Sequence, residues 1–233
     1  MNDSTPHTVV AILGMHRSGT SALAGLLNRH GLSLGNVVRR SPHNVRGNHE
    51  LVALRELHEK ILIHSGGGWD QPPANVSWSG HHRDELIDII RNQNSDIWGF
   101  KDPRSLLLLD LWRSLDIPLL FVGTVRHPHN VAHSITTRNP HISLQQAIDL
   151  WFRYNRILLR LTEQNSVALV NFDTDSNEYL ARVESIAKLL PIATRAVPDN
   201  FFEDSLRHWQ LAREVSLEPE VDNVYKRLLA CCN

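Results

Sequence analysis

Four short runs of apolar residues are spaced along the chain, and a turn signal follows each of them. Runs of this length, rich in Val, Ile, Leu and Phe, are typical of strands that are buried on both faces of a parallel sheet. A helical pattern follows each turn, and strands that alternate with helices predict a doubly wound α/β fold. The predicted strands cover residues 8–13, 97–100, 118–125 and 166–172.

Three longer segments carry apolar residues at helical spacing. Residues 50–63 place Leu51, Leu54, Leu57 and Ile61 on one face, and residues 143–162 and 177–190 are amphipathic as well. Residues 65–82 contain a glycine run and a proline pair, which predict a long loop, and such loops in compact domains are more often functional than idle. The alternative for this loop is a surface excursion without a function.

The loop between the first strand and the helical pattern after it reads Gly-Met-His-Arg-Ser-Gly-Thr-Ser over residues 14–21. A strand that feeds a glycine-bounded loop and then a helix directs backbone N–H groups and the positive end of the helix dipole at one point. The spacing matches the phosphate loop of ATP-binding proteins, but Thr20 stands at the lysine position and the cation is Arg17. We therefore expect a phosphate-like ligand other than the γ-phosphate of ATP.

Composition narrows the class of protein further. The chain has 233 residues, which suits a single domain over residues 1–233 built on a sheet of about four to five strands. Its net charge of -1 provides no general attraction for nucleic acid. Cys231 and Cys232 are adjacent and are the only cysteines, and the first apolar run is too short for a signal peptide or a membrane span. These features predict a cytoplasmic protein.

Further polar residues follow the predicted strand ends, where open α/β sheets bind ligands. Lys101 follows the second strand, and Arg126 ends the third, eight residues before Ser134. A helix that begins at Pro128 would place Ser134 on a face that can share one anion with Arg126. Glu50 stands at the start of a predicted helix.

These segments resemble the sulfotransferases that use 3'-phosphoadenosine 5'-phosphosulfate (PAPS), over residues 8–173. Members of that family have a P-loop NTPase-like fold. The resemblance implies that Arg126 and Ser134 bind the 3'-phosphate and that Lys101 lies near the transferring sulfuryl group, as in the Lys-Asp-Pro motif of the tyrosylprotein and bacterial small sulfotransferases. It also implies a loop for the 5'-phosphosulfate, formed by His16, Arg17, Ser18, Gly19, Thr20 and Ser21.

The chain departs from the cytosolic branch of that family at two places. Pro103 occupies the position of a histidine base, so another residue must take the proton; the tyrosylprotein branch uses a glutamate, which makes Glu50 the candidate and Asp102 the alternative. The C-terminal Arg-Lys-Gly segment is missing, and Arg207 and His208 are possible substitutes. Asp102 has a second interpretation as a brace for its loop, and Glu50 as a charge that favours the helix dipole.

The expected activity is transfer of a sulfuryl group from PAPS to a hydroxyl or amine of a sugar, lipid or small metabolite, with Arg17, Glu50 and Lys101 as catalytic residues and no metal required. Residues 65–82 are expected to contact the acceptor. Arg39, Arg40 and Arg46 form a basic face or an acceptor site. The alternatives are an ATP-dependent small-molecule kinase and a catalytically inactive nucleotide-binding module. A zinc site at His127, His129 and His133 has suitable spacing but no supporting cysteine or carboxylate cluster.

Overall fold

A parallel sheet lies at the centre of the protein, with its strands in the order β2-β1-β3-β4. The computed structural model describes residues 8–37, 47–164, 167–196 and 216–232. Because β1 pairs in parallel with both β2 and β3, its carboxyl end lies between the carboxyl ends of those two strands. The strands are β1 (Thr8–Leu13), β2 (Ile97–Lys101), β3 (Leu119–Val125) and β4 (Val167–Asn171).

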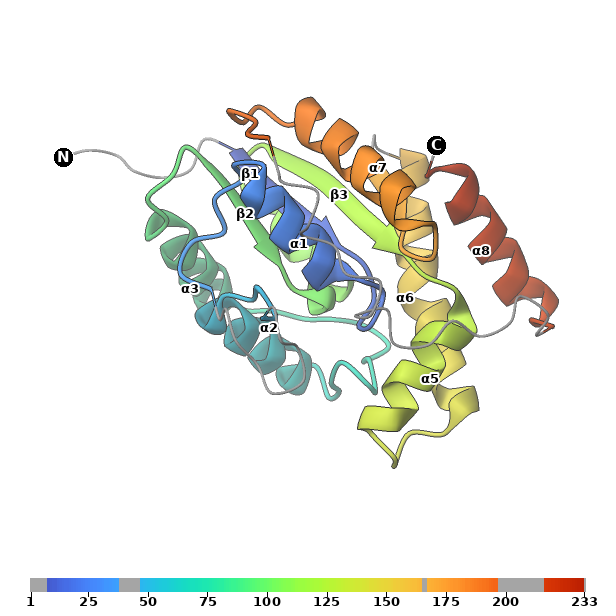
Figure 1. Ribbon diagram of the computed structural model, residues 1–233. Helices are drawn as coiled ribbons and strands as arrows, with labels where there is room; N and C mark the ends of the chain where they lie inside the picture. The colour runs from blue at the N-terminus through green and yellow to red at the C-terminus, as the bar shows by residue number, and fades with distance from the viewer. Residues whose placement is uncertain (1–7, 38–46, 165–166, 197–215, 233) are drawn as a thin grey trace.

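Helices cover both faces of this sheet, which confirms the predicted α/β fold (Figure 1). Helices α1 (Thr20–Arg29) and α7 (Ser176–Leu189) pack against the face that carries Val10 and Ile12 of β1. The opposite face of β1 carries Val9, Ala11 and Leu13 and packs against the remaining helices. These are α2 (Val52–His64), α3 (Gly80–Arg91), η1 (Pro103–Leu108), α4 (Leu109–Arg113), α5 (Pro128–Arg138), α6 (Leu144–Gln164) and α8 (Pro219–Ala230).

The boundaries differ from the predicted ones at a few places. The long loop after α2 ends at Ser79, whose side chain caps α3, so the last three residues of the predicted loop are helical. The predicted helix that was to begin at Glu50 begins two residues later, at Val52. Helix α8 was not predicted, although Pro219 at its first turn is a favourable start signal.

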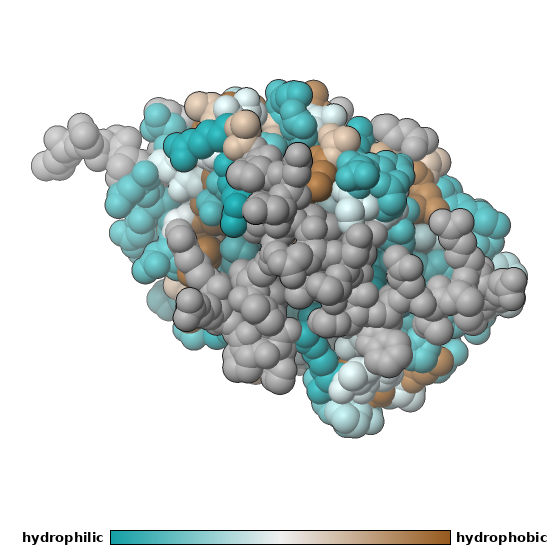
Figure 2. Space-filling view, viewed as in Figure 1, coloured by the Kyte–Doolittle hydropathy of each residue, from teal (hydrophilic) through white to brown (hydrophobic). Residues whose placement is uncertain are grey.

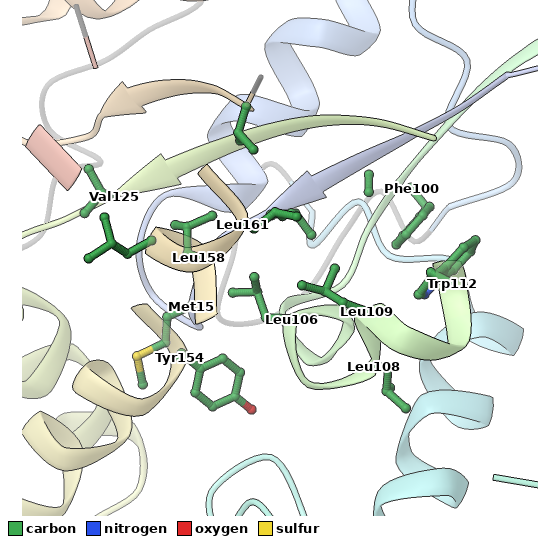
Figure 3. Close-up of a cluster of buried hydrophobic side chains, with 14 of the residues drawn as sticks. Met15, Phe100, Leu106, Leu108, Leu109, Trp112, Val125, Tyr154, Leu158 and Leu161 are labelled. Carbon is green, nitrogen blue, oxygen red and sulfur yellow. The ribbon is translucent and has the colours of Figure 1, made fainter. Parts of the chain in front are cut away.

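Large apolar side chains fill the interior on the side of the sheet opposite α1. Figure 3 shows part of this cluster, in which Phe100 of β2 lies beside Trp112 of α4 and Tyr154 of α6 lies near Met15. Among the described residues, four large hydrophobic side chains are exposed: Val52, Ile63, Leu144 and Leu189. In Figure 2 the coloured part of the surface is mainly hydrophilic, with small and separate hydrophobic areas.

Candidate functional site

The loop between β1 and α1 needs glycine at both of its ends. Gly14 has a φ of 146° and Gly19 a φ of 88°, both in the region that L side chains rarely adopt. A Cβ atom at Gly19 would lie 2.2 Å from the Phe172 ring, and one at Gly14 would lie 2.8 Å from the Thr124 carbonyl oxygen. Arg17, between the two glycines, also has a positive φ of 68°. Steric contacts and backbone conformation therefore explain why glycine stands at both position 14 and position 19.

The end of α1 that faces this loop is suited to an anion. The first N–H groups of a helix have no partner within the helix, and α1 has neither a capping side-chain bond nor an acidic residue in its first turn. Ser18 is fully buried, its Oγ has no hydrogen-bond partner, and its carbonyl oxygen accepts a bond from the Thr124 hydroxyl at 3.0 Å. Thr20 is buried, and the Ser21 hydroxyl donates to the Asn48 carbonyl oxygen at 3.3 Å.

Three arginines meet beside the loop. Arg17 Nε donates to the Ser134 hydroxyl at 2.8 Å, and Arg126 Nη1 donates to the Arg17 carbonyl oxygen at 3.2 Å. Arg126 and Ser134, which the sequence paired with each other, thus both contact Arg17. Burial lowers the pKa of Arg17 to about 10, and the charges of Arg138 and Arg126 act in the same direction. Burial and the neighbouring positive charges therefore make the charged form of Arg17 less favourable, and a bound anion would stabilise it.

Arg138 was missed by the sequence analysis. It ends α5, and burial lowers its pKa. It follows Ser134 by four residues, so both side chains lie on one face of the helix. This four-residue spacing from Ser134 is the sequence signal that identifies Arg138.

Asp173 is a second residue that was missed, and it braces the loop after β3. Its carboxylate accepts from the His127 backbone N–H at 2.6 Å and from Asn130 Nδ2 at 2.9 Å, and it lies 3.5 Å from Arg126 Nε. Trp151 Nε1 donates to the Arg126 carbonyl oxygen at 2.9 Å. Arg126 is therefore held at its backbone and at its side chain.

Lys101 and Glu50 form an ion pair at the carboxyl end of β2. Lys101 Nζ lies 2.6 Å from Glu50 Oε1, and the two side chains are 5% and 13% exposed. Lys101 is thus a buried residue and not a surface lysine. A carboxylate and an ammonium in this position are suited to accept a proton and to neutralise developing negative charge.

Asp102 has the contacts expected of a brace. It is 1% exposed, its Oδ2 accepts from His58 Nδ1 at 2.9 Å, and its Oδ1 accepts from the Arg104 backbone N–H at 3.0 Å and from Arg104 Nη1 at 3.1 Å. Burial acts to raise the pKa of Asp102, but the hydrogen bond from His58 and the charge and hydrogen bond of Arg104 outweigh it and hold this pKa below its usual range. Both carboxylate oxygens are engaged, which leaves Glu50 as the more accessible base.

The charges of both Arg17 and Lys101 act on His16, which belongs to the loop between β1 and α1. Burial holds its pKa well below the usual range, and the charges of Arg104, Lys101 and Arg17 lower it further. Its ring centroid is 4.5 Å from that of Trp69, which belongs to the loop after α2. Tyr154 fixes this loop by donating to the Trp69 carbonyl oxygen at 2.8 Å. The loop therefore has a defined position beside His16.

Five of the candidate residues lie outside the described part of the chain: Arg39, Arg40, Arg46, Arg207 and His208. Within the described part of the chain, no group of three His, Cys, Asp or Glu side chains is arranged to hold a metal ion. No helix in that part is both long enough and apolar enough to span a membrane.

Two solved structures resemble the whole chain. The sulfotransferase domain of the Synechococcus PCC 7002 olefin synthase matches with a TM-score of 0.55 and 16% identity, over 97% of this chain and 96% of that domain. This protein has a sulfotransferase fold. The sulfotransferase domain from the curacin biosynthetic pathway matches with a TM-score of 0.54 and 15% identity, over 96% of this chain and 98% of that domain. No family model and no curated protein matches the sequence. At this identity the sulfotransferase likeness establishes the fold alone.

Proposed function

We propose that the protein transfers a sulfuryl group from PAPS to a hydroxyl or amine of a small-molecule, glycan or lipid acceptor. The observation that carries this proposal is the cluster of Arg17, Arg126 and Arg138 beside the loop between β1 and α1. Burial and the positive charges of Arg138 and Arg126 lower the pKa of Arg17, which shows that positive charge is concentrated at this loop. A donor with a phosphosulfate and a separate 3'-phosphate supplies two anionic groups to such a site.

Residues 16–21 bind the 5'-phosphosulfate in this proposal. The N–H groups at the start of α1 and the Arg17 guanidinium contact its oxygens, and the Ser18 hydroxyl gains the hydrogen-bond partner that it otherwise lacks. Arg126, Ser134 and Arg138 bind the 3'-phosphate. Because arginine presents several N–H donors in a planar group, this cluster is better suited to phosphate than to a neutral ligand.

Lys101 and Glu50 carry the chemical step. The acceptor oxygen or nitrogen attacks sulfur, the bond from sulfur to the bridging oxygen of the 5'-phosphate breaks, and the acceptor's proton passes to Glu50. Lys101 turns from Glu50 to the leaving oxygen, where negative charge develops, and this movement frees the carboxylate. The loop of residues 65–79, whose Trp69 packs against His16, forms the part of the site that binds the acceptor.

The structure offers less support for a kinase. An ATP-type phosphate loop would have lysine at the position of Thr20, and such enzymes often place a metal-binding aspartate where Arg126 ends the third strand. An arginine there would repel the magnesium ion of an ATP complex. An inactive nucleotide-binding module would share the binding site and differ in turnover.

Calorimetry distinguishes these functions. We expect 3'-phosphoadenosine 5'-phosphate to bind without magnesium and to raise the melting temperature, because a ligand of the native state stabilises it. Equal or tighter binding of ATP with magnesium would refute the donor assignment. Binding of the bisphosphate without release of product from PAPS, tested across sugar, lipid and small hydroxyl or amine acceptors, would favour the inactive module.

A further inference from the structure

Two buried side chains, one from α2 and one from α4, contact the residues on either side of Lys101. His58 of α2 hydrogen-bonds Asp102, which follows Lys101, at 2.9 Å. Trp112 of α4 stacks on Phe100, which precedes Lys101, with 4.1 Å between the ring centroids and 12° between the planes. Figure 3 shows Phe100 and Trp112 lying side by side. The main chain at Lys101 is therefore held from both sides.

Trp112 also determines which nitrogen of His58 carries the proton. The indole Nε1 of Trp112 donates to His58 Nε2 at 3.2 Å. An indole N–H can only donate, so His58 Nε2 presents a lone pair and the proton of the neutral ring is on Nδ1, facing Asp102. Trp112 thus prepares His58 as a donor to Asp102.

Neither side chain is open to a ligand. The His58 side chain is fully buried and Trp112 is 2% exposed. Both ring nitrogens of His58 are engaged inside the protein. A buried imidazole in this arrangement has no route to an acceptor proton, and its effect must pass through the residues that it holds.

We propose that the Trp112–His58 pair positions Lys101 for sulfuryl transfer. His58 acts through Asp102, and Trp112 acts through Phe100 and through the tautomer of His58. The inference rests on the proposed function of Lys101 and makes His58 a positioning residue. A misplacement of about 1 Å at a reacting group is enough to cost about 10²-fold in rate, so the pair is required for turnover although it contacts no substrate.

Substitutions at His58 separate positioning from general packing. His58→Leu removes the donor to Asp102 and should lower kcat by about 10²-fold, with the KM for the donor changed by less than about threefold. His58→Asn retains an N–H donor on the Asp102 side and should recover most of kcat. Leu57→Ala is the matched control, because Leu57 is a fully buried neighbour in the same helix with no hydrogen bond to the residues flanking Lys101.

A double variant tests whether His58 acts through Lys101. In the Lys101→Ala background, His58→Leu should cause no further loss of kcat, because the group that it positions is already absent. An equal loss in both backgrounds would overturn the inference, and so would a loss in Leu57→Ala that matches that of His58→Leu.

A spectroscopic measurement tests the same inference without turnover. The chain has four lysines, so their side-chain ¹³Cε resonances are assignable, that of Lys101 by its loss in Lys101→Ala. His58→Leu should shift the Lys101 resonance, and Leu57→Ala and His58→Asn should leave it in place. An unshifted resonance in His58→Leu would overturn the inference, whereas absence of sulfuryl transfer by the wild-type protein would refute the proposed function.

Discussion

Replacing Arg17 by a neutral residue should stabilise the unliganded protein. Its pKa falls from 12.5 to about 10 because the guanidinium is buried and lies near Arg138 and Arg126. The difference between 12.5 and about 10 corresponds to about 3 kcal/mol, since one pKa unit is worth about 1.4 kcal/mol. This free energy opposes folding with Arg17 charged. The unfolded chain binds the proton more tightly, so the cost is complete below about pH 10 and diminishes only as the pH rises toward 12.5.

The expected gain in the free energy of unfolding is smaller than the cost of burying the charged Arg17. Arg17→Gln loses the hydrogen bond from Nε to the Ser134 hydroxyl, which is worth about 1 kcal/mol. Glutamine has the same backbone cost as arginine at the positive φ of residue 17, so this contribution cancels. The expected gain is about 2 kcal/mol, or about 4–8 °C in Tm for a chain of this size.

Thermal unfolding of three proteins measures this effect. Arg17→Gln should have a higher Tm than the wild type without ligand, whereas Arg17→Lys, which keeps the charge, should show no gain. With 3'-phosphoadenosine 5'-phosphate present, the wild type should have a higher Tm than Arg17→Gln, because the wild type gains binding energy that the glutamine variant has lost. A Tm for Arg17→Gln at or below that of Arg17→Lys would refute the argument that the arginine cluster is kept for an anion.

Four further outcomes follow from the site. Lys101→Ala should lower kcat by about 10²–10³-fold with little change in binding of the bisphosphate, measured by calorimetry. Glu50→Gln should lower kcat by about 10²–10⁴-fold; a loss below about tenfold, together with an inactive Asp102→Asn, would place the base elsewhere. Arg126→Ala should weaken 3'-phosphoadenosine 5'-phosphate far more than adenosine 5'-phosphate, and equal weakening would contradict its assignment to the 3'-phosphate. The pKa of His16 in the folded protein lies well below 6.5, so the unfolded chain binds the extra proton as the pH decreases. As the pH is lowered from about 6.5, the urea concentration at the unfolding midpoint should therefore decrease more steeply for the wild type than for His16→Gln.

Local patterns in the sequence were sufficient for the strands and for the loop between β1 and α1. Short apolar runs bounded by turn signals can be recognised without a partner, and β1 has the predicted boundaries. The two glycines of that loop were recognisable because their backbone conformation is a local property. Lys101 and Arg126 were candidates because the parallel fold brings strand ends to one edge of the sheet.

Only the tertiary structure decided which residues act together. Arg17 and Ser134 are separated by 117 positions, and His58 and Trp112 by 54, so no window of sequence contains either contact. Asp173 belongs to the site because of the contacts made after β4, and nothing in its immediate sequence distinguishes it from a surface charge. The spacing from Ser134 puts Arg138 on the same face of α5, but only the packing of that helix brings its charge near Arg17. The sequence determines which groups stand at the ends of the strands. Hydrogen bonds and charge interactions act over a few ångströms, so the packing of helices on the sheet determines which of those groups meet.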